Sequence, residues 1–312
     1  MLEDWNETTV SVPAPLSVSE RPARLTVGVV GVGRVGSVLA AALRQAGHRI
    51  VAASAVSAVS RGRVDALIGG TPVLDPPSVV AAAELVLLTV PDDALPGLVE
   101  GLVGAGAIQS GQLLVHTSGR FGVDVLGPAT RAGALPLALH PVMTFTGRPE
   151  DLARLDGCSF GVTSPDALRP IAEALVVEMG GEPEFVEEAM RPLYHAALAG
   201  GANHLTTLVN ESASLLARCG VEHPARMLGP LLGAALDNAL RAGDQALTGP
   251  VARGDAGTVA AHLRELRKVS PEALAAYIAM ARLTADRALA AGLLKPEAAE
   301  ALLEVLAEGS RP

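Results

Sequence analysis

The sequence predicts an α/β protein in which a doubly wound sheet, with helices on both faces, is followed by an all-helical C-terminal domain. From residue 24 to about residue 188, short apolar runs alternate with helical runs, whereas from residue 189 onward only long helical patterns occur. The 49% hydrophobic content is enough for one large or two medium domains in 312 residues. We therefore expect domains at residues 23–188 and 189–312. The expected strands are 25–30, 50–54, 85–90, 113–116, 137–139, 159–162 and 184–186.

The first expected strand opens into a glycine-rich turn and an alanine-rich helix. In this GxGxxG motif, Gly31 permits the tight turn, Gly33 lets backbone N–H groups approach a pyrophosphate, and Gly36 lets helix and strand pack closely. The unpaired amides at the helix N-terminus then bind the anion. The motif predicts a Rossmann domain with a bound dinucleotide, and the alternative is a fortuitous turn in a glycine-rich chain. The residues expected around the pyrophosphate are Gly31, Gly33, Arg34, Val35 and Gly36.

The end of the second expected strand, 50–54, favours NADP over NAD. NAD-binding domains place an acidic residue there, which binds the ribose 2′-hydroxyl. This sequence instead has Ser54, followed by hydroxyl and guanidinium groups that suit a 2′-phosphate. We expect Ser54, Ser57 and Arg61 to bind NADP. The alternative is that Arg61 and Arg63 are solvated charges at the start of the next helix.

The third expected strand, 85–90, ends at a proline. In an open parallel sheet, ligands bind in the crevice beyond the carboxyl ends of the strands. Pro91 stops the strand, and the backbone of Thr89, Val90 and Pro91 is expected to line the nicotinamide side of the cofactor. The two aspartates that follow are equally compatible with an ordinary turn.

Histidines lie at the ends of the next two strands. The strand expected at 113–116 ends in His116 and is soon followed by Ser118. The strand expected at 137–139 is followed directly by His140. Ser118 and His140 are expected to line the nicotinamide end of the site. The alternative for either histidine is a core imidazole hydrogen-bonded to a backbone carbonyl.

A polar cluster lies on the first long helix of the C-terminal domain. Tyr194 or His195 and Asn203 are about two turns apart on nearby faces, and the small residues between them leave room for a ligand. Close helix packing through the same small residues is the alternative. Further along, Asp255 and His262 fall at helical spacing, and Asp255 is equally compatible with a helix N-cap.

Composition excludes several classes of protein. A net charge of −9 and 2% aromatic residues argue against a nucleic-acid surface, because there is neither a basic stripe nor a stacking platform. Cys158 and Cys219 match no metal-ligand spacing and are expected to be reduced thiols, with no metal site. No long apolar run indicates a membrane span. Residues 1–22 lack the pattern of a secretory signal and are expected to form a flexible tail on a cytoplasmic protein.

Several motifs together resemble a family of bacterial Rossmann-like oxidoreductases whose helical C-terminal half is a domain of unknown function. The resemblance covers the chain from about residue 24 onward. Relatives of this architecture include pyrroline-5-carboxylate reductase, the 6-phosphogluconate and β-hydroxyacid dehydrogenases and ketopantoate reductases. The motifs are GVVGVGRVG, HTSG (116–119), LHPVMTF (139–145), YHAALAGGANHL (194–205) and TGPVARGDAGTVAAHL (248–263).

This resemblance implies an NADPH-dependent reductase of a small ketone or imine, with ketopantoate, a 2-oxoacid, as a named candidate. It also implies a substrate cleft between the domains and a homodimer formed by the C-terminal helices. The alternative is a non-catalytic protein that binds NADP as a sensor or as a partner-binding module, because a fold does not establish a function.

One departure from the resemblance concerns the proton donor. The β-hydroxyacid dehydrogenases carry a lysine general acid on the first long helix of the second domain, but the only lysines here are Lys268 and Lys295, which lie elsewhere. His195 occupies roughly that region, and an imidazole can protonate an alkoxide or an amine as hydride arrives. We expect His195 to be the proton donor and Asn203 to orient the substrate, with Ser118 at the nicotinamide end.

Overall fold

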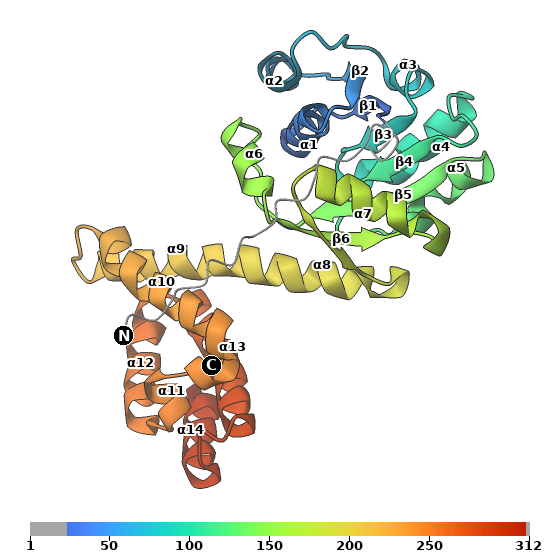
Figure 1. Cartoon of the computed structure of the whole chain (residues 1–312). Coiled ribbons are helices and arrows are strands. Elements are labelled where there is room, and N and C mark those ends of the chain that lie inside the picture. Colours follow the sequence, from blue (N-terminus) through green and yellow to red (C-terminus); the bar gives the residue numbers. More distant parts are fainter. Residues whose placement is uncertain (1–23, 310–312) are drawn as a thin grey trace, which may run out of the picture. The chain divides into compact units, whose positions relative to one another are not determined.

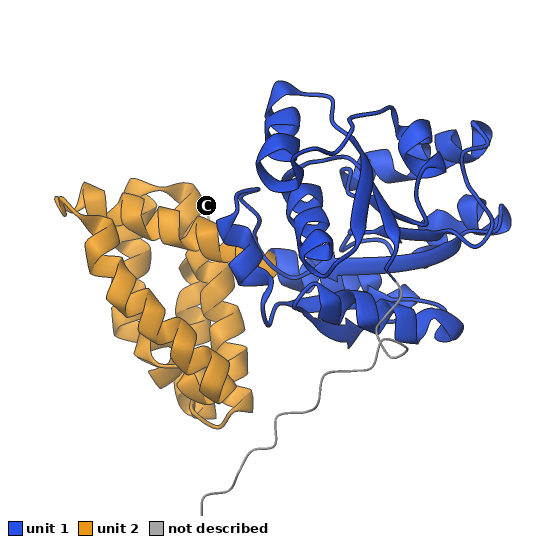
Figure 2. Ribbon diagram, turned by 45° about the horizontal axis from the view of Figure 1, so that its top comes forward, with its two compact units in different colours: residues 1–199 blue, residues 200–312 orange. Residues whose placement is uncertain are grey.

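The computed structural model describes residues 24–309, and the chain divides into two compact units, residues 1–199 and 200–312 (Figure 2). The expected tail, residues 1–22, lies outside the described residues. The division falls after Ala199 rather than after Glu188, where the sequence pattern predicted it. The difference arises because helix α8 (Arg191–Ala199) begins with the buried Arg191, which is hydrogen-bonded to the sheet of the first unit.

The first unit contains a seven-stranded sheet with the order β2-β1-β3-β4-β5-β6-β7 (Figure 1). Each of the seven predicted strands is present, with shifts of a few residues at the ends. The fifth strand is the most extended relative to its prediction. The strands are β1 (Thr26–Val30), β2 (Arg49–Ser54), β3 (Leu85–Leu88), β4 (Leu113–His116), β5 (Leu135–Pro141), β6 (Ser159–Thr163) and β7 (Glu182–Phe185).

The sheet is parallel from β2 to β5, but β6 runs antiparallel to β5 and β7 runs parallel to β6. The sheet of this doubly wound domain therefore contains one antiparallel pair. Helix α6 (Glu150–Leu155) lies in the connection between β5 and β6. Because these two strands are antiparallel, β6 starts at the edge where β5 ends, and Gly161 of β6 pairs with His140 of β5.

Helices cover both faces of the sheet, as expected for a doubly wound fold. Apolar side chains of the sheet form one core with α1, α2, α6 and α7, and a second core on the other face with α3, α4 and α5. The helices of the first face are α1 (Arg34–Gln45), α2 (Ala58–Ile68), α6 and α7 (Arg169–Glu178). Those of the second face are α3 (Pro76–Ala81), α4 (Leu95–Gly104) and α5 (Gly127–Arg131).

The second unit is helical throughout its described residues. Its core is formed by four helices and includes Val259, Leu263, Ala285 and Leu302. Helix α13 is capped by Ser270, whose hydroxyl accepts from the N–H of Ala273, and α14 begins at Pro296. The helices are α9 (Leu205–Arg218), α10 (Pro224–Ala242), α11 (Gly249–Arg253), α12 (Ala256–Val269), α13 (Pro271–Ala290) and α14 (Pro296–Gly309). Between residues 24 and 309, no helix has both the length and the hydropathy needed to cross a membrane.

Candidate functional site

The turn between β1 and α1 has the geometry of a phosphate-binding loop. Gly31 has φ of +91°, which L side chains rarely adopt. A Cβ atom on Gly36 would collide with the Thr89 hydroxyl and lie 2.7 Å from the Gly31 carbonyl oxygen. At Gly33 the nearest atom to such a Cβ would be 4.0 Å away. The fold therefore requires Gly31 and Gly36 for its own packing, whereas Gly33 faces open space.

The N-terminus of α1 has no protein cap. Gly33 is the N-cap residue, no side chain accepts from the first-turn amides, and the first turn contains no acidic residue. The amides of Arg34, Val35 and Gly36 therefore lie at the positive end of the helix dipole, at a helix end that lacks an intrahelical acceptor for them. This donor set and the open side of Gly33 fit a pyrophosphate group.

Thr89 and Val90 hold the glycine turn in place. The Thr89 hydroxyl donates to the carbonyl of Gly31 at 2.6 Å, and the Thr89 N–H donates to the carbonyl of Val30 at 2.9 Å. The Val90 side chain packs against Gly31. Pro91 directly precedes the short 3₁₀ helix η2 (Asp92–Ala94). Two of the three predicted residues at the end of β3, Thr89 and Val90, thus contact the glycine turn.

The end of β2 carries the predicted hydroxyl and guanidinium groups. Ser54 is buried, and its carbonyl accepts from the N–H of Val32 at 2.9 Å. Ser57 is the N-cap of α2, with its hydroxyl accepting from the N–H of Ser60 at 3.0 Å. Arg61 is exposed and donates only to the carbonyl of Ala55, at 3.4 Å. Its guanidinium therefore retains further donors for a ligand.

Two more arginines lie close together near this strand end. A Cβ on Gly147, in the loop after β5, would lie 2.6 Å from Nε of Arg63 and 3.1 Å from Cα of Arg34. The loop is held by Asp151, whose buried carboxylate accepts from the N–H groups of Thr146 at 2.7 Å and Gly147 at 2.8 Å. The sequence pattern did not reveal this approach, because the loop is far from both arginines along the chain.

Two predicted site histidines converge on Gly119, beyond the carboxyl end of β4. A Cβ on Gly119 would lie 2.8 Å from Cδ2 of His195 and 2.9 Å from Nε2 of His140. The two imidazole rings are 6.3 Å apart between centroids and nearly perpendicular, at 85°. His140 and His195 are therefore neighbours, although two strands, β6 and β7, lie between them along the chain.

Tyr194 and Arg191 complete this cluster. The Tyr194 hydroxyl is 2.8 Å from Nδ1 of His140. Arg191 is only 1% exposed and donates to Thr163 Oγ1 at 2.7 Å and to the carbonyl of Gly161 at 3.0 Å. Nothing in the sequence pattern marks Arg191 as part of this cluster, because an arginine in the first turn of a helix ordinarily faces solvent.

Ser118 and His116 have structural partners. The Ser118 hydroxyl accepts from the N–H groups of Arg120 and Phe121, each at 3.2 Å, so it stabilises the turn after β4. His116 is fully buried, with Nδ1 accepting from the Ser118 N–H at 3.2 Å and Nε2 donating to the carbonyl of Gly122 at 2.8 Å. The core-imidazole alternative therefore describes His116.

The buried histidines are held neutral. Burial lowers the pKa of His116 to about 4. Burial, followed by the nearby charge of Arg191, lowers the pKa of His140 to about 4 as well. The cluster therefore combines a buried guanidinium with two uncharged imidazoles at neutral pH.

This arrangement predicts that acid destabilises the protein well above the usual carboxylate range. Below about pH 6.5 the unfolded chain takes up protons on His116 and His140 that the folded chain, with a pKa of about 4 at each, does not bind. The free energy of unfolding should fall from pH 6.5 to pH 4, by up to about 1.4 kcal/mol per pH unit for each histidine. Urea unfolding of wild type and of His116→Asn at several pH values measures this, and the free energy of unfolding should depend less steeply on pH in the variant. Identical slopes would contradict this account.

The remaining predicted site residues lie in the second unit. Asn203 is exposed, in the π-helical segment η6 (Gly200–His204), and π-helical turns are frequent at functional sites. Asp255 is the N-cap of α12 and accepts from the N–H of Thr258 at 3.0 Å, which is the alternative considered for it. His262 is 2.9 Å from the hydroxyl of Tyr277.

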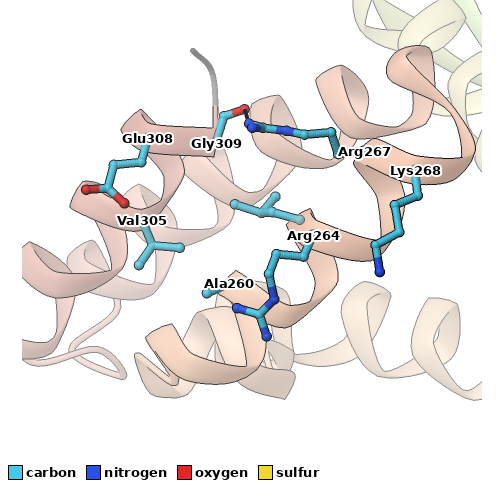
Figure 3. Close-up of a pocket in the computed structure, with 8 residues that line it drawn as sticks. Ala260, Arg264, Arg267, Lys268, Val305, Glu308 and Gly309 are labelled. Atoms are coloured by element: carbon cyan, nitrogen blue, oxygen red, sulfur yellow. Dashed lines mark hydrogen bonds between the residues drawn. The ribbon is translucent and has the colours of Figure 1, made fainter. Parts of the chain in front are cut away.

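A surface cavity of about 490 Å³ also lies in the second unit, between α12 and α14 (Figure 3). Its lining combines the apolar Leu263 and Val305 with the charged Arg264, Lys268 and Glu308. None of the site residues predicted from the sequence lines this cavity.

Comparisons with known proteins agree with this architecture. Residues 12–141 match the family model of a Rossmann-like domain, and residues 158–284 match the model of a domain of unknown function, DUF2520. No curated protein matches the sequence significantly.

Solved structures share the fold at low sequence identity. BF3122 from Bacteroides fragilis, provisionally named an NADP oxidoreductase, is similar with a TM-score of 0.68 and 20% identity over 84% of this chain and 98% of that one. An imine reductase from Pseudomonas sp. has a TM-score of 0.57 and 20% identity, covering 91% of this chain and 93% of that one. The 1-pyrroline-5-carboxylate reductase of Streptococcus pyogenes has a TM-score of 0.57 and 15% identity, covering 85% and 98%. The chain thus matches a Rossmann-like domain model followed by a DUF2520 model, and it shares its fold with these three solved structures.

Proposed function

We propose that the protein is an NADPH-dependent reductase of a small ketone or imine. The observation that carries this proposal is the convergence of His140 and His195 on Gly119, beyond the carboxyl end of the same sheet whose β1–α1 turn fits a pyrophosphate. Ligands of open α/β sheets bind at that edge. A dinucleotide whose pyrophosphate occupies the turn can extend its nicotinamide toward the histidines.

In this proposal, each group of the chain has a defined task. The amides of Arg34, Val35 and Gly36 bind the pyrophosphate on the open side of Gly33, and bound NADPH supplies the hydride. As the hydride adds to the carbonyl or imine carbon, His195 gives its proton to the oxygen or nitrogen. Ser118 and His140 are proposed to lie beside the nicotinamide, and Asn203 is proposed to orient the substrate. A 2-oxoacid such as ketopantoate is the named candidate substrate.

The test is NADPH oxidation by the full-length protein, followed at the nicotinamide absorbance, with a panel of 2-oxoacids and cyclic imines. Substrate-dependent oxidation of NADPH is expected with one of these two classes. Tight NADPH binding without turnover on any member would contradict the reductase and favour the alternative, a non-catalytic NADP sensor.

The proposed cofactor preference gives a further prediction. NADPH should bind more tightly than NADH, because the exposed Arg61 has donors left for a 2′-phosphate. Replacing Arg61 by Ala should weaken NADPH binding about tenfold to 100-fold and leave NADH binding unchanged, since a hydrogen bond to a charged group is worth about 1.5–3 kcal/mol. Fluorescence titrations with both nucleotides measure this. Arg131→Ala, at the end of α5, is the matched control. Equal affinity of wild type for the two nucleotides would remove the preference.

A homodimer formed by the C-terminal helices is part of the same proposal. Helix α9 has no buried residue and α10 has only Leu228, yet both carry large apolar side chains. Leu231 is 63% exposed and Leu240 is 80% exposed. Apolar faces of this extent usually contact another protein. A second copy of the chain is the partner that we propose for them.

Sedimentation velocity tests the dimer. Wild type should sediment with twice the mass of the chain, and Leu231→Glu should shift it toward the monomer, because a charge would be buried in the interface. Leu303→Glu, at a less exposed leucine of α14, is the control and should leave the dimer intact. A monomeric wild type would exclude this interface.

A further inference from the structure

Arg191 is a buried cation whose hydrogen-bond acceptors include no carboxylate. Its side chain is among the largest fully buried ones. Buried charges in proteins are ordinarily paired with an opposite charge. Within residues 24–309, the guanidinium instead donates to one hydroxyl and to three backbone carbonyls. Such an arrangement keeps a net positive charge inside the first unit.

The acceptors of Arg191 come from β5, from β6 and from the turn after β4. They are Oγ1 of Thr163 in β6 at 2.7 Å, the carbonyl of Gly161 in β6 at 3.0 Å, the carbonyl of Ala138 in β5 at 3.2 Å and, more weakly, the carbonyl of Ser118 after β4 at 3.4 Å. One planar side chain therefore ties the start of α8 to the edge of the sheet where the two site histidines lie.

This attachment determines where Tyr194 lies. The phenol ring is one turn after Arg191 on α8, with its centroid 5.5 Å from the guanidinium carbon. It fills the space above Gly161, where a Cβ would collide with the tyrosine hydroxyl. The same hydroxyl is 2.8 Å from Nδ1 of His140, whose ring lies edge-on to the phenol at 87°. Arg191, Tyr194 and His140 thus form one connected unit.

The charged and titratable groups around His140 disfavour a second positive charge there. Arg191, Tyr194 and His195 face it from α8, and the buried His116 faces it from β4. The nearest carboxylates act on other members of the cluster: Asp92 on His116, and Glu188 on Arg191. Glu188 is itself bound by the N–H of Val123 at 2.7 Å. Burial also raises the pKa of the Tyr194 hydroxyl, so that the tyrosine remains protonated.

We propose that Arg191 is a positioning residue that locks the Tyr194–His140 pair in one uncharged, hydrogen-bonded form, which leaves His195 as the histidine that delivers the proton. Proton delivery by His195 rests on the proposed reductase function. The effect of Arg191 on the Tyr194–His140 pair does not, because the hydrogen-bonded form of His140 exists without turnover. Arg191 acts through Tyr194 and His140 rather than by contact with substrate.

The test is a titration of the histidine side chains by NMR in the full-length ¹⁵N-labelled protein, with His140 assigned from the spectrum of His140→Gln. In wild type we expect one neutral tautomer of His140 throughout the range from pH 8 to pH 5. In Arg191→Met, which removes the charge at similar volume, the titration midpoint of His140 should move upward and its two tautomers should exchange. An unchanged midpoint together with a single tautomer in Arg191→Met would overturn the proposal.

Two further variants separate positioning from general destabilisation. Thr163→Val removes one acceptor of Arg191 but keeps the positive charge. The two tautomers of His140 should therefore exchange, while the titration midpoint of His140 stays low. This variant also tests the positioning role of Arg191 if Arg191→Met does not fold. Arg169→Met, at a half-exposed arginine stacked on Phe185, is the control and should change neither property. Tautomer exchange in the control but not in Thr163→Val would contradict the proposal.

Turnover separates this inference from the proposed function. If wild type reduces a substrate, kcat of Arg191→Met should fall about 10²-fold, as expected for a displaced catalytic group, with the KM for NADPH unchanged. If no substrate of the panel supports oxidation of NADPH by wild type, the reductase is excluded. The state of His140 in the NMR titration still decides the role of Arg191 in that case.

Discussion

Replacing His195 by Ala should lower kcat by about 10²–10⁴-fold, the usual contribution of a positioned general acid. The affinity for NADPH should stay unchanged, because the proposed pyrophosphate site at the N-terminus of α1 belongs to different elements. His195 is half-buried beside Gly119 and His140, so its ring can reach a substrate at the carboxyl edge of the sheet. Steady-state kinetics with the best substrate of the panel, combined with NADPH titration, measures both quantities.

The control for this variant is His262→Ala. His262 is an exposed histidine of α12 that pairs with Tyr277 in the second unit, and its loss should leave kcat near the wild-type value. An equal decrease in kcat and in NADPH affinity for His195→Ala would instead indicate a structural role for His195.

Replacing Gly33 by Ala should weaken NADPH binding about tenfold to 100-fold while leaving the stability of the protein unchanged. A methyl group there meets no protein atom closer than 4.0 Å, but it would occupy the space proposed for the pyrophosphate. Inserting a methyl group into a filled site costs about 1–3 kcal/mol, which corresponds to this change in affinity. NADPH titration and thermal unfolding of the same preparation measure the two effects.

Gly36→Ala provides the contrasting variant. Its Cβ would collide with the Thr89 hydroxyl and approach the Gly31 carbonyl, so the variant should lose about 1–3 kcal/mol of stability even without nucleotide. A Gly33→Ala protein that binds NADPH as tightly as wild type would place the pyrophosphate elsewhere.

The sequence allowed the strands and the glycine turn between β1 and α1 to be predicted, because both depend on local patterns. Buried strands are continuous apolar runs, such as residues 85–88 and 113–115, and the turn requires glycine at fixed spacing. Capping residues such as Ser270 were predictable for the same reason, since a cap and its helix are adjacent in the chain.

Other features depend on contacts between distant residues and could not be predicted. The antiparallel direction of β6 depends on how the chain returns to the sheet after β5, which no periodicity encodes. Arg191 looks like a surface charge in sequence, but its partners lie 28 to 73 residues away. The pairing of His140 with Tyr194 likewise joins residues 54 positions apart. Their roles follow only from the folded first unit.

Calorimetric titration of the purified full-length protein with NADPH tests the central claim most directly, namely that backbone amides at the start of α1 bind a pyridine dinucleotide. We predict saturable binding at one site per chain, weakened in Gly33→Ala. A protein that shows no saturable binding of NADPH or NADH would contradict the dinucleotide site and, with it, the proposed reductase.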